Sequence, residues 1–189
     1  MKLGEAVGFL AVFVTMMSIS SSPHPVILIL CYLIHEAGHL FFVKLTGARV
    51  RRMSIGGFKL CLHYDCSMIS YKKELLVCAG GIIFNLVSAL LFIALPVKDS
   101  ESASFFVLCN FSLALMNLYP VSTLDGGGIL KCIFKSIFEE AKAEKLCKRV
   151  SFFFVFIMWL CAVYLQLIFN SNISFLFISV FLLIELCFS

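Results

Sequence analysis

Six apolar stretches, each about 20 residues long, constrain this chain most, because about 20 apolar residues in a helix cross the roughly 30 Å hydrocarbon core of a membrane. Of the 189 residues, 61% are hydrophobic and 14% are charged. Soluble domains have about 45–50% apolar and about 25% charged residues, so this composition excludes a soluble enzyme, a disordered tail and a nucleic-acid module. We therefore predict an all-α polytopic membrane protein with six transmembrane helices. The predicted helices are residues 5–20, 25–46, 75–97, 103–120, 150–169 and 173–189.

Two polar stretches, residues 47–74 and 121–149, lie between these helices, and neither is long enough for a folded domain of its own. Residues 55–64 contain a glycine pair followed by partly alternating apolar and polar residues, which predicts a small β-hairpin insert. Residues 127–149 carry apolar side chains at helical spacing, which predicts an interfacial amphipathic helix. We therefore expect one membrane-embedded domain over residues 1–189, with a core at 25–130, an amphipathic cytoplasmic segment at 127–149 and two accessory transmembrane helices at 150–189.

The Lys and Arg residues lie on one side of the predicted helices, with Lys98 as the exception. Such residues in short loops stay cytoplasmic, so both termini are predicted to be cytoplasmic. The first apolar stretch also resembles a secretory signal segment, but its retention is favoured because Lys2 is opposed by Glu5. The net charge of +4 indicates contact with anionic lipid and no nucleic-acid partner.

Residues 35–39, His-Glu-Ala-Gly-His, place two histidines and a glutamate within an apolar stretch. Residues four apart lie on one face of a helix, so both imidazoles can reach one metal ion. Zinc accepts neutral histidine nitrogens, and a catalytic zinc keeps one position for water. Glu36 is adjacent to His35, where its carboxylate can accept a proton from that water without being a ligand. Because ionisable residues are costly inside a membrane, the motif indicates a functional zinc site.

Two alternative roles for this motif stay open. The three side chains could form a polar cluster that holds helices together. A haem site would need a further ligand from His24 or His63, because two histidines on one face of a helix cannot ligate opposite faces of a macrocycle. The nine cysteines form no Cys-x-x-Cys pair and are interpreted as structural, with no disulfide framework.

A zinc ion held by two histidines needs a third protein ligand from elsewhere in the chain. Asp125 is favoured because it follows the helix-ending Pro120 on the cytoplasmic side and precedes three glycines that let the backbone turn closely. The alternatives His63, Asp65 and Glu139 stay open.

Residues 117–126, Asn-Leu-Tyr-Pro-Val-Ser-Thr-Leu-Asp-Gly, resemble the Asn-x-x-Pro and Leu-Asp-Gly signature of the site-2 proteases, the intramembrane zinc metalloproteases. The signature follows the His-Glu-x-x-His motif in the order that the family requires. Residues 80–85, Gly-Gly-Ile-Ile-Phe-Asn, resemble the family's Ala-Gly-Pro-x-x-Asn. The chain departs from the family pattern at Gly80, Ile82 and Ser122, which concerns local helix geometry and not the metal site.

The resemblance covers roughly residues 25–130 and implies a role for each matching residue. It implies one Zn²⁺ per chain with His35, His39 and Asp125 as ligands, and Glu36 as the general base. Asn85 would hold substrate backbone or stabilise the oxyanion, and Asn117 would contact substrate or serve as scaffold. In the family the segment after the motif helix is β-structured, so Gly56 and Gly57 would lie where an extended substrate pairs with a strand edge.

The short six-helix form is similar to the bacterial stage IV sporulation proteases without their nucleotide-sensing domain. That similarity implies a protease of a bacterial cell membrane that cleaves a membrane-embedded or membrane-tethered protein, such as a sigma-factor precursor or an anti-sigma factor, near the cytoplasmic face. A membrane regulatory or inhibitor protein is an expected partner. The alternatives are a catalytically inactive membrane scaffold of the same fold and a zinc-binding membrane transporter.

Overall fold

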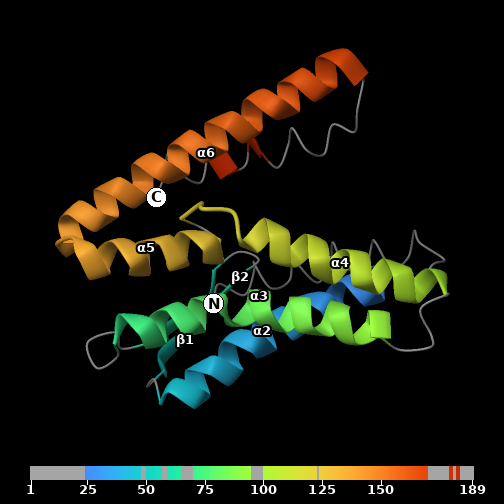
Figure 1. Cartoon of the computed structure of the whole chain (residues 1–189), viewed down its shortest axis with the longest axis horizontal. Coiled ribbons are helices and arrows are strands. Elements are labelled where there is room, and N and C mark those ends of the chain that lie inside the picture. Colours follow the sequence, from blue (N-terminus) through green and yellow to red (C-terminus); the bar gives the residue numbers. More distant parts are fainter. Residues whose placement is uncertain are drawn as a thin grey trace. The chain divides into compact units, whose positions relative to one another are not determined.

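The computed structural model describes residues 24–47, 50–56, 59–64, 70–94, 100–122, 124–169, 179–180 and 182–183. In chain order the elements are α2 (His24–Thr46), β1 (Val50–Gly56), β2 (Lys59–Tyr64), α3 (Tyr71–Ala94), α4 (Glu101–Asn117), α5 (Asp125–Ile137) and α6 (Glu140–Phe169) (Figure 1). The predicted helix at residues 5–20 lies outside the described residues, as does most of 173–189. The chain divides into two compact units, Met1–Met116 and Asn117–Ser189, and each unit is described separately.

Three helices within the described residues are long and apolar enough to cross a membrane: α2, α3 and residues 140–168 of α6. Their outward surfaces carry large apolar side chains, among them Leu45, Leu90 and Leu167. Such surfaces are stable in lipid and costly in water, which agrees with a membrane protein. The remaining predicted transmembrane helices stay predictions.

Helices α2 and α3 of the first unit pack against each other (Figure 1). The helices approach closely at Gly38 and Gly80, where a Cβ atom built on Gly80 would lie 2.7 Å from the carbonyl oxygen of Gly38. Small residues let transmembrane helices approach in this way, since packing and not hydrophobic burial drives helix association in lipid. Glycine at both positions therefore determines the separation of the two helices.

Helix α4 packs on α2 through the buried side chains of Cys31, Phe106 and Cys109. Asn110, which has no exposed surface, donates through Nδ2 to the carbonyl oxygen of Phe106 and to Sγ of Cys31, each at 3.0 Å. Both cysteines are free thiols, as expected for small apolar fillers. Hydrogen bonding therefore supplements close packing at the α2–α4 contact.

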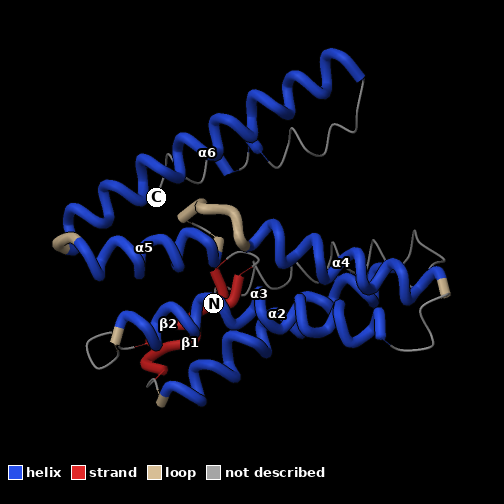
Figure 2. The backbone as a smooth tube through the Cα atoms, viewed as in Figure 1, coloured by secondary structure: helices blue, strands red, loops and turns tan. Residues whose placement is uncertain are grey.

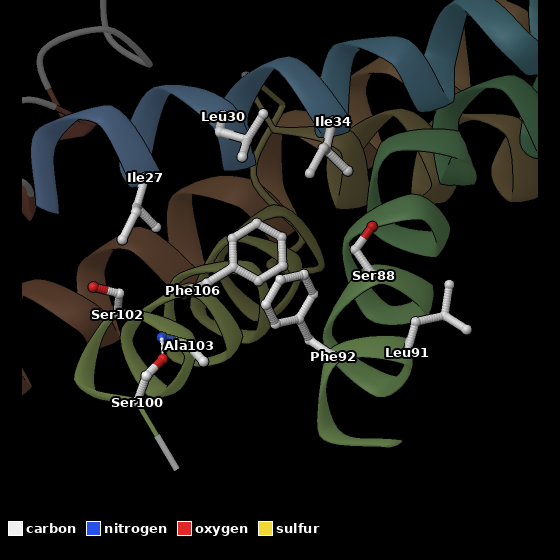
Figure 3. A pocket seen from close by; sticks show the side chains of 10 residues that line it. All are labelled: Ile27, Leu30, Ile34, Ser88, Leu91, Phe92, Ser100, Ser102, Ala103 and Phe106. Atoms are coloured by element: carbon white, nitrogen blue, oxygen red, sulfur yellow. Dashed lines mark hydrogen bonds between the residues drawn. The ribbon is translucent and has the colours of Figure 1, made fainter. Parts of the chain in front are cut away.

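A cavity of about 590 Å³ lies between α2, α3 and α4 (Figure 3). Its wall is mostly apolar, and the rings of Phe92 and Phe106 face each other within it, with centroids 4.3 Å apart. Ile34 lines the cavity, but its neighbours His35 and Glu36 do not. This cavity is therefore distinct from the candidate metal site.

Strands β1 and β2 pair in antiparallel register, with Ile55 opposite Leu60 and Gly56 opposite Lys59 (Figure 2). The pairing is irregular between Val50 and Arg52. Gly57 lies outside the described residues. The proposed contact of this segment with substrate stays a prediction.

Helices α5 and α6 form an antiparallel pair in the second unit (Figure 1). Two ion pairs connect their facing surfaces: Lys131 to Glu144 at 2.7 Å and Lys135 to Glu140 at 2.6 Å. The predicted amphipathic segment 127–149 thus divides between two helices, because the chain turns after Ile137 and its second part begins the long helix α6.

Candidate metal centre

His35 and His39 lie on the same face of α2, one helical turn apart. Their Nε2 atoms are 3.2 Å apart, and both rings are buried, with exposed fractions of 4% and 8%. The rings meet edge to face, with centroids 4.9 Å apart. Two imidazole nitrogens that converge in this way are suited to bind one cation.

The other ring nitrogen of His39, Nδ1, lies 2.8 Å from the backbone carbonyl oxygen of Val77 on α3. A carbonyl oxygen only accepts hydrogen bonds, so Nδ1 carries the proton and donates it. In the neutral ring Nε2 is then unprotonated and has its lone pair available for a metal ion. Histidine ligands are usually held through a hydrogen bond from their second nitrogen in this manner.

Gly81 of α3 lies directly against both imidazoles. A Cβ atom built on Gly81 would lie 2.5 Å from Cε1 of His35 and 2.6 Å from Nε2 of His39, too close for any side chain. Glycine at this position therefore gives the two rings the space in which their Nε2 atoms converge.

Asn85, a further turn along α3, has an exposed fraction of 0%. Its Nδ2 atom lies 3.3 Å from Nδ1 of His35, and its Oδ1 atom has no hydrogen-bond partner among the described residues. The structure thus places this sequence-predicted residue against a histidine of the motif. Its predicted role toward substrate stays a prediction.

Glu36 is also buried, with an exposed fraction of 9%. Its Oε2 atom has no hydrogen-bond partner within the described part of the chain. An ionised carboxylate is stable in such a place only with a donor or a cation near it. The residues of the first unit therefore fit a divalent metal: two convergent imidazole nitrogens, with an unsatisfied carboxylate oxygen on the residue next to one of them.

Asp125 is the first residue of α5 in the second unit and is 5% exposed. The glycines after it allow a tight turn, since a Cβ atom built on Gly126 would lie 2.5 Å from the carbonyl oxygen of Tyr119. Ser151 of α6 supports the same turn: its hydroxyl accepts from the backbone N–H of Ser122 at 3.0 Å and donates to the carbonyl oxygen of Pro120 at 3.2 Å. The turn residues therefore hold a buried carboxylate at the start of α5.

The other candidate residues from the sequence are exposed, lie at a helix end or lie outside the described residues. Glu139 is exposed between α5 and α6, and His24 begins α2, with Nε2 4.0 Å from a carboxylate oxygen of Glu101. The side chain of His63 and the whole of Asp65 lie outside the described residues. Asn117 is partly buried at the end of α4.

Comparison with solved structures shows which class of protein has this fold. The chain is similar to the site-2 protease from Methanocaldococcus jannaschii, with a TM-score of 0.69 over 96% of this chain and 86% of that one. The sequence identity is 19%, so this likeness concerns the fold.

Sequence comparison extends this likeness to a family. Residues 97–158, which include Asp125, match the model of peptidase family M50. The chain is also 26% identical over 167 residues to stage IV sporulation protein FB of Bacillus subtilis (strain 168), covering 84% of this chain and 57% of that protein. The resemblance to the site-2 proteases, inferred from the motifs, is thereby confirmed.

Proposed function

We propose that this protein is a zinc-dependent intramembrane metalloendopeptidase. The observation that supports the proposal most directly is the 3.2 Å approach of two buried Nε2 atoms, from His35 and His39, on a helix that is long and apolar enough to cross a membrane. Two imidazole nitrogens that converge inside such a helix form a donor pair of the kind that zinc binds. The similarity to family M50 agrees with a peptidase.

Asp125 is proposed as the third ligand. Each of the three residues is buried and offers one ligand atom of a kind that zinc binds. Two histidines and one carboxylate leave a fourth position open, as catalytic zinc sites require. When bound, zinc supplies Lewis-acid chemistry that polarises a peptide carbonyl and acidifies water.

Glu36 is proposed as the general base. Its Oε2 atom is buried and has no partner among the described residues, so it can accept a proton from the attacking water. As the water oxygen bonds to the carbonyl carbon and the C–N bond breaks, the same carboxyl returns the proton to the departing amine. One residue thus serves both proton transfers, and no further acid is needed.

The proposed substrate is a membrane-embedded or membrane-tethered protein cut near the cytoplasmic face. A transmembrane helix shields its amides within its own hydrogen bonds, so the enzyme has to bind an unwound segment. The strand edge near Gly56 and Gly57, together with Asn117, is proposed to hold that segment. The similarity to a sporulation protein supports a sigma-factor precursor or an anti-sigma factor as the substrate class, in regulated intramembrane proteolysis.

Elemental analysis of the detergent-purified chain tests the proposal without a substrate. We expect about one tightly held zinc per chain. Variants His35→Ala and Asp125→Ala should lose it, and Glu139→Ala, which removes an exposed carboxylate, should retain it. Zinc retained in Asp125→Ala would transfer the third-ligand role to another residue. A wild-type chain that binds no zinc after reconstitution would favour the inactive scaffold.

A further inference from the structure

Three positions of α3 contact the histidine pair and occur at intervals of four residues: Val77, Gly81 and Asn85. This spacing places them on one face of the helix. That face packs against the two histidines, which are themselves four residues apart on α2. Val77 contacts His39 by a backbone oxygen, Asn85 contacts His35 by its side chain, and Gly81 leaves room for both rings. One face of α3 therefore contacts Nδ1 of His35 and Nδ1 of His39.

The two contacts are not equivalent in chemical terms. The carbonyl of Val77 accepts from Nδ1 of His39 at 2.8 Å, which leaves the Nε2 lone pair of that ring available. If Nδ2 of Asn85 donates to Nδ1 of His35, the proton of the neutral ring lies on Nε2. That Nε2–H would donate to Nε2 of His39 at 3.2 Å, and His35 could not then bind a metal ion through the nitrogen that faces His39.

A half-turn of the Asn85 amide exchanges its Oδ1 and Nδ2 atoms, which have nearly the same shape. Oδ1, which has no partner among the described residues, then accepts from Nδ1 of His35. The Nε2 lone pair of His35 becomes available, and Nδ2 of Asn85 is left to donate to water or to a substrate carbonyl. Both imidazoles then present an unprotonated Nε2.

We propose that Asn85 is a positioning residue of the metal site, whose Oδ1 accepts the Nδ1–H of His35 so that Nε2 binds the ion. The carbonyl of Val77 has the same effect on His39. This inference rests on the proposed function, because it assumes that the histidine pair binds a metal. It assigns Asn85 a role in the absence of substrate, which a purely substrate-binding residue would not have.

Zinc affinity of the detergent-solubilised full chain, measured by competition with a chromophoric chelator, tests the proposal without substrate. Asn85→Leu, which keeps the approximate size and removes the acceptor, should weaken zinc binding by about 10–100-fold, the usual effect of losing such a support. Asn85→Asp, which can only accept at neutral pH, should bind zinc nearly as tightly as the wild type. Asn110→Leu is the matched control, because it removes another fully buried asparagine of the same unit, away from the histidines, and should leave affinity unchanged.

A second measurement reads the tautomer directly, from the ¹⁵N spectrum of histidine-labelled protein before and after zinc is added. In the metal-free wild type we expect the proton of His35 on Nε2, donated to Nε2 of His39 at 3.2 Å. When zinc binds, we expect this proton on Nδ1 in a hydrogen bond to Asn85, and Asn85→Leu should lack that hydrogen bond. Wild-type zinc affinity in Asn85→Leu would overturn the positioning role. Equal weakening in Asn85→Asp and Asn85→Leu would mean that Asn85 donates through Nδ2, which also overturns it. A wild type that binds no zinc would contradict the proposed function, whereas a wild type that binds zinc through Nδ1 of His35 would overturn the positioning role alone.

Discussion

Gly81 of α3 and His39 of α2 are so close that a Cβ atom on the glycine would lie 2.6 Å from Nε2 of the histidine. The Nε2 edge of the ring therefore faces helix backbone with no side chain between them. A side chain added at residue 81 would therefore have to displace an imidazole ring.

Gly81→Ala should lower zinc affinity. The added methyl group would collide with His35 and His39, so at least one of the two rings would have to move. Alanine is otherwise the better helix former by about 1 kcal/mol, so α3 itself should remain helical. Zinc titration with circular dichroism checks both statements, with the outward-facing Val87→Ala as control. Unchanged zinc affinity would mean that the rings can separate without loss.

Glu36→Gln should retain zinc and lose peptide cleavage. The amide keeps the shape of the side chain but cannot accept the proton of the attacking water, and a general base contributes about 10²–10⁴-fold to rate. Cleavage of co-reconstituted single-span membrane proteins, followed by mass spectrometry, measures the loss. Cleavage near the wild-type rate would remove Glu36 from the mechanism.

Gly80→Val should destabilise the first unit. The side chain has no space beside the carbonyl of Gly38 and the ring of Phe42, and overpacking of this kind costs about 1–3 kcal/mol or more when backbone is the obstacle. Unfolding by sodium dodecyl sulfate in mixed micelles gives the free energy change. Leu90→Val, on the outward face of the same helix, should have little effect.

Ser151→Ala should loosen the turn before Asp125. It removes both hydrogen bonds that hold Pro120 and Ser122, at a cost of about 1 kcal/mol each in typical proteins. We expect a lower thermal midpoint and weaker zinc binding, because Asp125, the proposed third ligand, is held less firmly. The exposed Ser136→Ala is the control, because the hydroxyl of Ser136 donates to the carbonyl oxygen of Ile133 in its own helix. A variant with wild-type zinc affinity would show that the turn needs no support from α6.

The local parts of the candidate site were predictable from the sequence. Helical spacing alone places His35 and His39 on one face, and the glycines after Asp125 indicate a close turn. Both inferences need only geometry within one short segment. The order of the motifs supported the resemblance to the site-2 proteases, and the comparisons confirm this resemblance.

The contacts between segments were not predictable in the same way. Val77 acts through its backbone oxygen, which no side-chain pattern reveals, and Ser151 is one serine in a long apolar helix. The role of Gly81 depends on the register of α3 against α2, which is determined by packing and not by spacing within either helix. Hydrophobic periodicity likewise gave no sign that residues 140–149 begin the long helix α6.

The close backbone contact between Gly38 and Gly80 matters when the thickness or fluidity of the membrane changes. Bilayers become thinner, thicker or more fluid as temperature and lipid supply change, and helices joined through long side chains can slide with them. Two helices packed backbone against backbone cannot slide past each other in this way. The spacing of the histidines against α3 should therefore stay constant while the lipid around it varies, and lipid composition should affect the entry of substrate more than the chemistry that follows.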